Sequence, residues 1–282
     1  MKLGGYDIYP VSDGRFRLDG GAMFGVVPKV LWERCCEADG LNRIPLSLTC
    51  LLIRARGRNI LVDTGLGPKE DERFHRMFAV ERTPTLLESL KRLGVGPDDI
   101  HLVINTHLHF DHAGGNTLRG DNGALNPTFP KARYVVQRGE FEDAAGANER
   151  TKASYRSENF SPIAQLNQWE FLDGDTEIAP GITAVVTAGH TRYHQGVRIE
   201  SQGQVAFFLG DLIPTASHLP LPYIMGYDLF PIQTLEAKRR LLDRAAEERW
   251  LLLFEHDPQI QAGLVMKDHD GKYLLQKVNI WQ

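Results

Sequence analysis

Short apolar runs alternate with polar, glycine-containing segments along most of the chain. Residues 47–53 and 59–63 are β-type runs joined by a polar stretch, which predicts a hairpin. Four leucines fall on one helical face between Thr83-Pro84, a predicted N-cap followed by a first-turn proline, and Gly94, which predicts an amphipathic helix. Further strands are expected at 101–105, 133–136, 169–172, 182–187, 196–200 and 205–209.

The C-terminal third continues the same pattern. A long helix is expected at about 233–249, followed by a strand at 250–254 and a closing hairpin whose turn is 268–271. Residues 112–167 and 212–231 are richer in Gly, Pro, Asn and Ser than their surroundings, and we expect them around a pocket. Strands alternate with helices in mixed order, which predicts an α/β (α+β) fold of two sheets with helices outside.

Composition restricts the class of protein. The 282 residues are 42% hydrophobic, enough to bury a sizeable core, and the formal net charge of −4 offers no basic surface for nucleic acid. No internal repeat or low-complexity linker divides the chain, so we expect one domain over 1–282 with an N-terminal loop or dimerisation segment at about 1–45. Three cysteines, read as free thiols, and the lack of a leader-like or membrane-spanning run predict a cytoplasmic protein without a membrane partner.

The stretch Thr106-His107-Leu108-His109-Phe110-Asp111-His112 concentrates ligand-type side chains directly after an apolar run. In extended backbone, side chains two positions apart point the same way, so His107, His109 and Asp111 share a face while His112 turns away. One pair of imidazoles can chelate one ion, which leaves Asp111 and His112 for a neighbouring ion. The alternative is a set of surface histidines on a solvated loop, and the clustering favours metal ligands over it.

Three later ligand-type residues share one feature, because each follows an apolar strand. They are His190, Asp211 and His256. Strand ends are where folds of this type place their chemistry. Seven candidate ligands are too many for one tetrahedral ion, which indicates two metals.

The order HLHFDH, His190, Asp211 and His256 resembles the metal-binding pattern of the metallo-β-lactamase-fold hydrolases. The resemblance implies a four-layer αββα sandwich and two divalent ions, with zinc expected first and manganese, cobalt or iron as alternatives. Carried over by position, His107, His109 and His190 bind the first metal, Asp111, His112 and His256 the second, and Asp211 bridges them. It also implies that Asp63 and His194 orient ligands without touching the metals.

The same resemblance implies a reaction. A hydroxide bridging the two metals attacks a lactone or ester carbonyl, and Asp111 orients it and passes its proton to the leaving group. Three other subfamilies fit less well. Many β-lactamases carry cysteine at the position of Asp211, and glyoxalase II enzymes have a C-terminal helical extension that the 26 residues after His256 cannot form. The RNA-processing members insert a second domain, for which we expect no room in this chain. The chain is most similar to the acyl-homoserine-lactone lactonase and methyl parathion hydrolase group, whose promiscuous phosphotriesterase or arylesterase activity is an associated expectation.

Within that group, the run 18–28 resembles a loop beside the metals, so Met23 and Phe24 are predicted to contact a small lactone or ester substrate; ordinary core positions are the alternative. Lactonases of the group place a tyrosine three residues after the bridging aspartate, where this chain has Pro214. His218 and Tyr223 are the predicted catalytic substitutes, with buried structural positions as the alternative. The polar loop 149–156, with Arg150, Tyr155 and Arg156, either caps the pocket or is simply solvated.

Three alternatives remain open at this stage: a diiron redox protein of the same fold, a hydrolase of a different ester or thioester class, and a scaffold that has lost catalysis. All seven candidate ligands are present, which disfavours the scaffold. A homodimer formed through the N-terminal segment is a further expectation from the resemblance.

Overall fold

The computed structural model describes residues 1–280, and its centre is a pair of seven-stranded sheets. The first sheet has the order β1-β2-β3-β4-β5-β8-β9, and the second runs β10 to β16 in sequence order. A separate hairpin pairs β6 with β7. The strands are β1 (Lys2–Leu3), β2 (Tyr6–Asp19), β3 (Arg43–Ala55), β4 (Arg58–Val62), β5 (Ile100–Ile104), β6 (Thr117–Arg119), β7 (Leu125–Pro127), β8 (Arg133–Gln137), β9 (Trp169–Leu172), β10 (Thr176–Ala179), β11 (Ile182–Val186), β12 (Gln195–Ser201), β13 (Gln204–Phe208), β14 (Leu251–Leu253), β15 (Ala262–Lys267) and β16 (Tyr273–Lys277).

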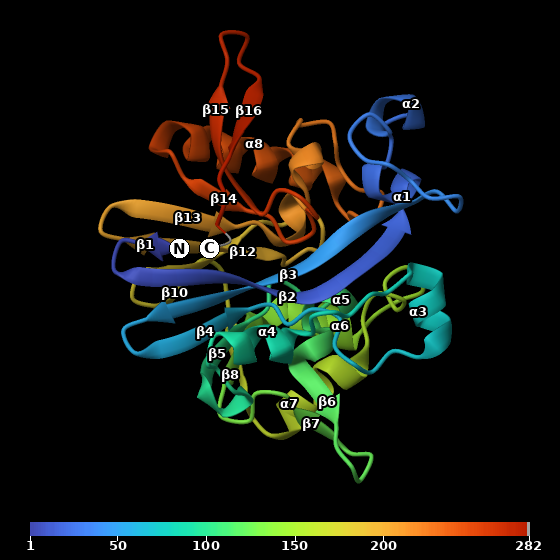
Figure 1. Ribbon diagram of the computed structural model, residues 1–282, viewed down its shortest axis with the longest axis vertical. Coiled ribbons are helices and arrows are strands. Elements are labelled where there is room, and N and C mark those ends of the chain that lie inside the picture. Colours follow the sequence, from blue (N-terminus) through green and yellow to red (C-terminus); the bar gives the residue numbers. More distant parts are fainter. Residues whose placement is uncertain (281–282) are drawn as a thin grey trace.

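Helices cover the outer faces of both sheets (Figure 1). The α-helices are α1 (Gly20–Phe24), α2 (Lys29–Trp32), α3 (Glu72–Phe78), α4 (Leu86–Arg92), α5 (Phe110–Ala113), α6 (Arg138–Ala145), α7 (Ser161–Gln165) and α8 (Pro231–Glu248). Short 3₁₀ turns are η1 (Pro97–Asp99), η2 (Gly114–Asn116), η3 (Ser157–Asn159), η4 (Gly210–Leu212) and η5 (Ala216–His218). Among these described helices, none combines the length and the apolar character needed to cross a bilayer.

Three apolar layers hold the sandwich together. Ile53, Val62, Ile199 and Phe208 belong to the core between the two sheets. A second core lies between the first sheet and α4, α6 and α7, and a third lies between the second sheet and α8. Because β3 has apolar layers on both sides, its residues are buried almost continuously instead of alternating. The predicted four-layer αββα fold is confirmed.

The predicted hairpins and most strands are confirmed with small changes at their ends. The amphipathic helix begins later than predicted, because Thr85 is its N-cap and forms a capping box with Glu88, while Thr83-Pro84 lies outside it. Gly94 does end this helix: its φ is +70°, and its backbone N–H donates to Lys91 O.

The prediction of a loop at about 1–45 is wrong in its secondary structure. Most of the first nineteen residues form β2, a 14-residue strand that pairs with β3 along its length. A register shift between Ser12 and Arg15 breaks the period-two pattern there, and Pro10 and Gly14 also hid the strand from a propensity argument. The run 18–28 completes β2 and then forms the short helix α1.

Candidate metal centre

The predicted ligands come together because the strands that carry them end at one edge of the sandwich. β4 is parallel to β5, and β13 is parallel to β14. β11 is antiparallel to β12, which is antiparallel to β13, so β11 and β13 point the same way. His190, Asp211 and His256 therefore follow strands that end at one edge of the second sheet, and His107 and His109, which follow β5 of the first sheet, meet His190 and Asp211 there.

The first group consists of His107, His109, His190 and Asp211, whose ligand atoms all lie within 4.8 Å of one another. His190 Nε2 is 3.0 Å from His109 Nδ1 and 3.1 Å from Asp211 Oδ2. Burial lowers the pKa of His107 and of His109 well below the usual histidine range, so both imidazoles are neutral and keep a lone pair for a ligand.

The second group consists of Asp111, His112 and His256. His112 Nε2 lies 3.1 Å from His256 Nε2 and 3.8 Å from Asp111 Oδ2. Burial opposes the charged form of His256, but the Asp211 carboxylate outweighs it and raises its pKa to about 9.

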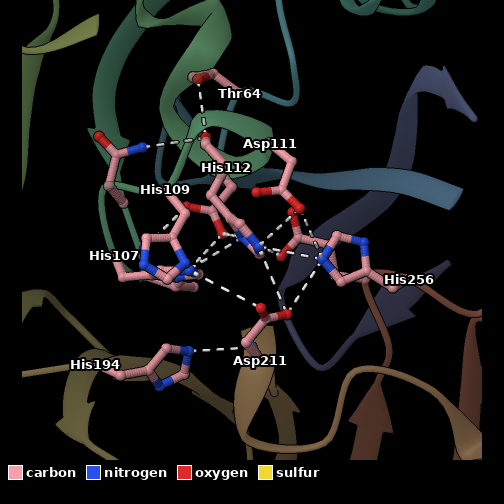
Figure 2. Close-up of polar contacts among 12 residues, drawn as sticks. Thr64, His107, His109, Asp111, His112, His194, Asp211 and His256 are labelled. Carbon is pink, nitrogen blue, oxygen red and sulfur yellow. Dashed lines mark hydrogen bonds and ion pairs between the residues drawn. The ribbon is translucent and has the colours of Figure 1, made fainter. Parts of the chain in front are cut away.

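Asp211 lies between the two groups, with one carboxylate oxygen toward each (Figure 2). Its Oδ2 faces His190, while its Oδ1 lies 3.1 Å from His256 Nε2 and 3.5 Å from His112 Nε2. Asp211 Oδ1 and His107 Nε2 are buried without a hydrogen-bond partner. Unpaired buried polar atoms are costly unless something binds them, and two cations, one per group, fit these donors.

A surrounding layer of hydrogen bonds orients the imidazoles. Asp63 Oδ2 is 3.1 Å from His112 Nδ1 and 2.6 Å from Thr106 Oγ1, which places it where the sequence predicted an orienting aspartate. His194 lies beside the centre, where its Nε2 accepts from the backbone N–H of Asp211 at 3.0 Å (Figure 2) and its ring centroid is 5.1 Å from that of His107. His256 Nδ1 contacts Ser47 O at 2.8 Å.

Three buried carboxylates near this centre were missed by the sequence argument. Asp228 Oδ1 is 2.9 Å from His190 Nδ1, Glu255 Oε2 is 3.1 Å from His112 Nδ1, and Glu140 lies behind the loops that carry the ligands. Glu255 directly precedes His256, so its position in the sequence was a usable signal. Asp228 and Glu140 lie in segments without any ligand motif, so nothing local pointed to them.

A cavity of about 510 Å³ opens onto both groups. His109, Asp111, His190, Asp211 and His256 form its floor. Its walls are largely apolar and come from α1, α3 and the loops 150–156 and 225–229, with side chains that include Met23, Phe74, Phe78, Phe110, Met225 and Leu229. Both segments predicted to surround a pocket therefore do so, although 112–167 also contains the strands β6, β7 and β8 and the helices α6 and α7.

The two predicted substrate contacts, Met23 and Phe24, have different positions relative to the cavity. Met23 lines the cavity. Phe24 is fully buried and stacks between Trp32 and His218, with ring centroids 5.4 and 4.5 Å away. Phe24 is thus a core residue, as the alternative interpretation had it.

The two predicted catalytic substitutes also lie behind the wall. Both ring nitrogens of His218 are engaged, Nε2 with Met23 O at 2.8 Å and Nδ1 with Thr215 Oγ1 at 2.8 Å. Tyr223 contacts Phe24 edge-on, and neither residue lines the cavity. Tyr227 does line it, together with Arg150 and Arg156 of the polar loop.

Tyr227 is held in place by its neighbours in the chain. Gly226 N donates to Ala22 O at 2.8 Å, and Arg150 Nη2 donates to Gly226 O at 3.0 Å. On the other side Asp228 bonds His190. Burial, with Asp19 and Asp111 adding to it, raises the pKa of Tyr227 to about 12, so its phenol stays protonated at neutral pH.

Fold and site together define the class of protein. The chain belongs to the metallo-beta-lactamase superfamily, whose family model matches residues 43–256. It is therefore a member of a family of metal-dependent hydrolases, as the order of its ligand motifs predicted.

Individual relatives narrow the comparison. The chain is 31% identical to the N-acyl homoserine lactonase AiiA of Bacillus thuringiensis subsp. kurstaki over 225 residues, which is 75% of this chain and 82% of that protein. It is 32% identical to the crystal structure of a probable metal-dependent hydrolase from Staphylococcus aureus, with a TM-score of 0.89 over 99% of this chain and 100% of that one. It shares the fold of AidC, a dizinc quorum-quenching lactonase in complex with a product, at 20% identity and a TM-score of 0.83 over 100% and 97% of the two chains.

Proposed function

We propose that this protein is a dinuclear metal-dependent lactonase that opens the ring of an acyl-homoserine lactone or a closely similar lactone or ester. The observation that carries the proposal is Asp211, whose two oxygens face two separate buried ligand groups at the floor of an apolar cavity. In the proposal His107, His109 and His190 hold one ion, Asp111, His112 and His256 hold the other, and Asp211 bridges them. Zinc is the first expectation for both ions.

Two such ions would supply a water molecule of lowered pKa and polarise the carbonyl group. The protein's own groups then act on the rest of the reaction. Asp111 lines the cavity, where its carboxylate can accept the proton of the attacking water. As the carbonyl carbon gains the water oxygen, the ring C–O bond breaks, and that proton goes to the leaving alkoxide.

Lactonases of the group use a tyrosine at the position where this chain has Pro214, and we propose that the hydroxyl of Tyr227 takes its role. As a protonated phenol on the cavity wall, it can donate a hydrogen bond to the substrate where negative charge develops. The apolar wall formed by Met23, Phe74 and Phe78 suits an acyl chain, and Arg150 and Arg156 suit the polar amide of the same molecule. The relatives named as lactonases support this substrate class.

The test combines elemental analysis of the purified protein with hydrolysis of a long-chain acyl-homoserine lactone, an aryl ester and a phosphotriester. We expect two metal equivalents and preferential lactone opening, detected as the open-ring hydroxy acid. Two equivalents with fastest cleavage of the phosphotriester would overturn the substrate class, and faster cleavage of the aryl ester than of the lactone would overturn the preference for a lactone. Two irons with no hydrolysis would favour the diiron redox alternative, which no observation on the described residues supports. The homodimer and the cytoplasmic location stay predictions.

A further inference from the structure

Glu140 is a fully buried carboxylate to which the proposed reaction assigns no part. It lies in the first turn of α6, outside both ligand groups. Three donors converge on its two oxygens. Leu108 N and Tyr155 Oη donate to Oε1 at 3.1 and 2.9 Å, and Thr191 Oγ1 donates to Oε2 at 2.6 Å.

The donors come from three loops that are far apart in the sequence, and each lies next to the metal centre. Leu108 separates His107 from His109, and Thr191 directly follows His190. The two imidazoles that must share one ion, His109 and His190, therefore come from loops fastened to the same carboxylate. Their nitrogens are 3.0 Å apart.

The third donor connects the carboxylate to the cavity wall. Tyr155 forms an isolated β-bridge with His109, and its ring lies 4.8 Å from the His109 ring between centroids. Phe110 N also donates to Ser154 O at 2.9 Å. The loop that ends at Tyr155 lines the cavity through Arg150, Thr151 and Ser154.

We propose that Glu140 is a positioning residue for the His109–His190 half of the metal centre, and that through Tyr155 it also sets the position of the cavity wall at 150–156. This inference rests on the proposed two-metal function. A buried carboxylate is costly unless its oxygens are hydrogen-bonded, so Glu140 favours the arrangement in which all three loops keep their donors beside it. Groups that orient ligands in this way typically change metal affinity or activity by about 10- to 100-fold when they are removed.

Glu140→Ala and Glu140→Gln separate positioning from mere stability. The alanine variant removes all three bonds. The glutamine variant keeps an oxygen for Leu108 and Tyr155 and an amide N–H that can donate to Thr191 Oγ1. With Zn²⁺ titrated into the metal-free proteins, we expect Glu140→Ala to bind one equivalent about as tightly as wild type and the other about 10- to 100-fold more weakly, and Glu140→Gln to recover most of that loss.

Tyr155→Phe tests the hydrogen bond to Glu140, and Tyr134→Phe is the control for the loss of a buried hydroxyl. Tyr134 is also buried, and its hydroxyl accepts from Phe129 N at 3.1 Å and donates to Asn116 O at 3.2 Å, without contacting Glu140. We expect Tyr155→Phe to weaken one metal equivalent and to raise KM more than it lowers kcat, because the cavity wall shifts. Tyr134→Phe should change only the thermal stability.

The outcomes distinguish this inference from the function on which it rests. If wild type does not bind two equivalents, the two-metal proposal fails and this inference fails with it. If wild type binds two, but Glu140→Ala and Tyr155→Phe bind both as tightly as Tyr134→Phe does, only the positioning role is overturned. Should Glu140→Ala fail to fold, Tyr155→Phe and Thr191→Val decide the question by the same titration.

Discussion

Asp211 is the residue on which the two halves of the centre depend. Each of its oxygens lies near the ligands of one group, so its removal separates them. We expect Asp211→Ala to lower the metal content and to reduce lactone hydrolysis to the background rate. Elemental analysis and a ring-opening assay check this. Asp121→Ala, in the exposed turn between β6 and β7, should behave as wild type, and full metal content with full activity in Asp211→Ala would refute the bridging role.

Tyr227 and Tyr223 provide a test of which hydroxyl serves the reaction. Tyr227 lines the cavity, whereas Tyr223 packs against Phe24 behind its wall. Because a hydrogen bond to developing charge acts mainly in the transition state, Tyr227→Phe should lower kcat by roughly 10²-fold while metal content stays the same. Steady-state kinetics on both variants measure this. A larger loss in Tyr223→Phe would restore the sequence-based prediction.

At the level of elements, what could be read from the sequence depended on local patterns. The ligand motif and the strand-end residues His190, Asp211 and His256 were identifiable because each lies next to an apolar run. Glu140 and Asp228 could not be found, because their partners are brought to them only by the folded loops. β2 was missed for a related reason. The register shift between Ser12 and Arg15 interrupts the alternation of apolar and polar residues, and the strand is recognisable only from its pairing with β3.

One lysine of α8 organises the segment behind the cavity wall. Lys238 Nζ is buried and donates to His218 O at 2.6 Å and to Pro220 O and Tyr223 O at 2.9 Å. Lys238→Met would remove this shared donor, although Pro220 O would keep the backbone N–H of Tyr223, and should reduce the free energy of unfolding by roughly 3 kcal/mol. Urea titration measures the change. Arg239→Met, on the exposed side of the same helix, should stay within about 0.5 kcal/mol of wild type, and an equal effect in both would contradict this account.

His218 makes the same segment sensitive to acid. Burial lowers the pKa of His218 to about 4, below its usual 6.5. Between these values the unfolded chain binds a proton that the folded chain does not, so stability falls as the pH falls from 6.5 to 4. His218→Gln, which can still donate to Met23 O, lacks this proton. As the pH falls through that window, the free energy of unfolding of His218→Gln relative to wild type should rise by up to about 1.4 kcal/mol per pH unit. Urea titrations at several pH values measure this, and the same pH dependence in both proteins would contradict it.

On the scale of the whole molecule, the proposed ligands and most of the cavity wall come from the part of the chain that matches the family model. The family match ends at the last proposed ligand and begins at the first residue of β3, so it contains all seven proposed ligands. Leu18 and Met23, which line the cavity, lie before it. The N-terminal segment therefore adds two apolar side chains to a cavity that the matched region otherwise forms.

Metal binding should also support the entire sandwich, because the proposed ligands come from both sheets. Ions that bind only the folded state stabilise it by about 4 kcal/mol each when present at 1,000 times their Kd. Chelation should therefore lower Tm by roughly 10 °C or more in a chain of this size. Differential scanning calorimetry before and after dialysis against a chelator measures the change, and readdition of Zn²⁺ should reverse it, whereas Mg²⁺, which prefers oxygen ligands, should not. A Tm that is unaffected by chelation, in protein shown by elemental analysis to have lost its metals, would mean that the histidine-rich edge is stable by itself and that the ions serve the reaction alone.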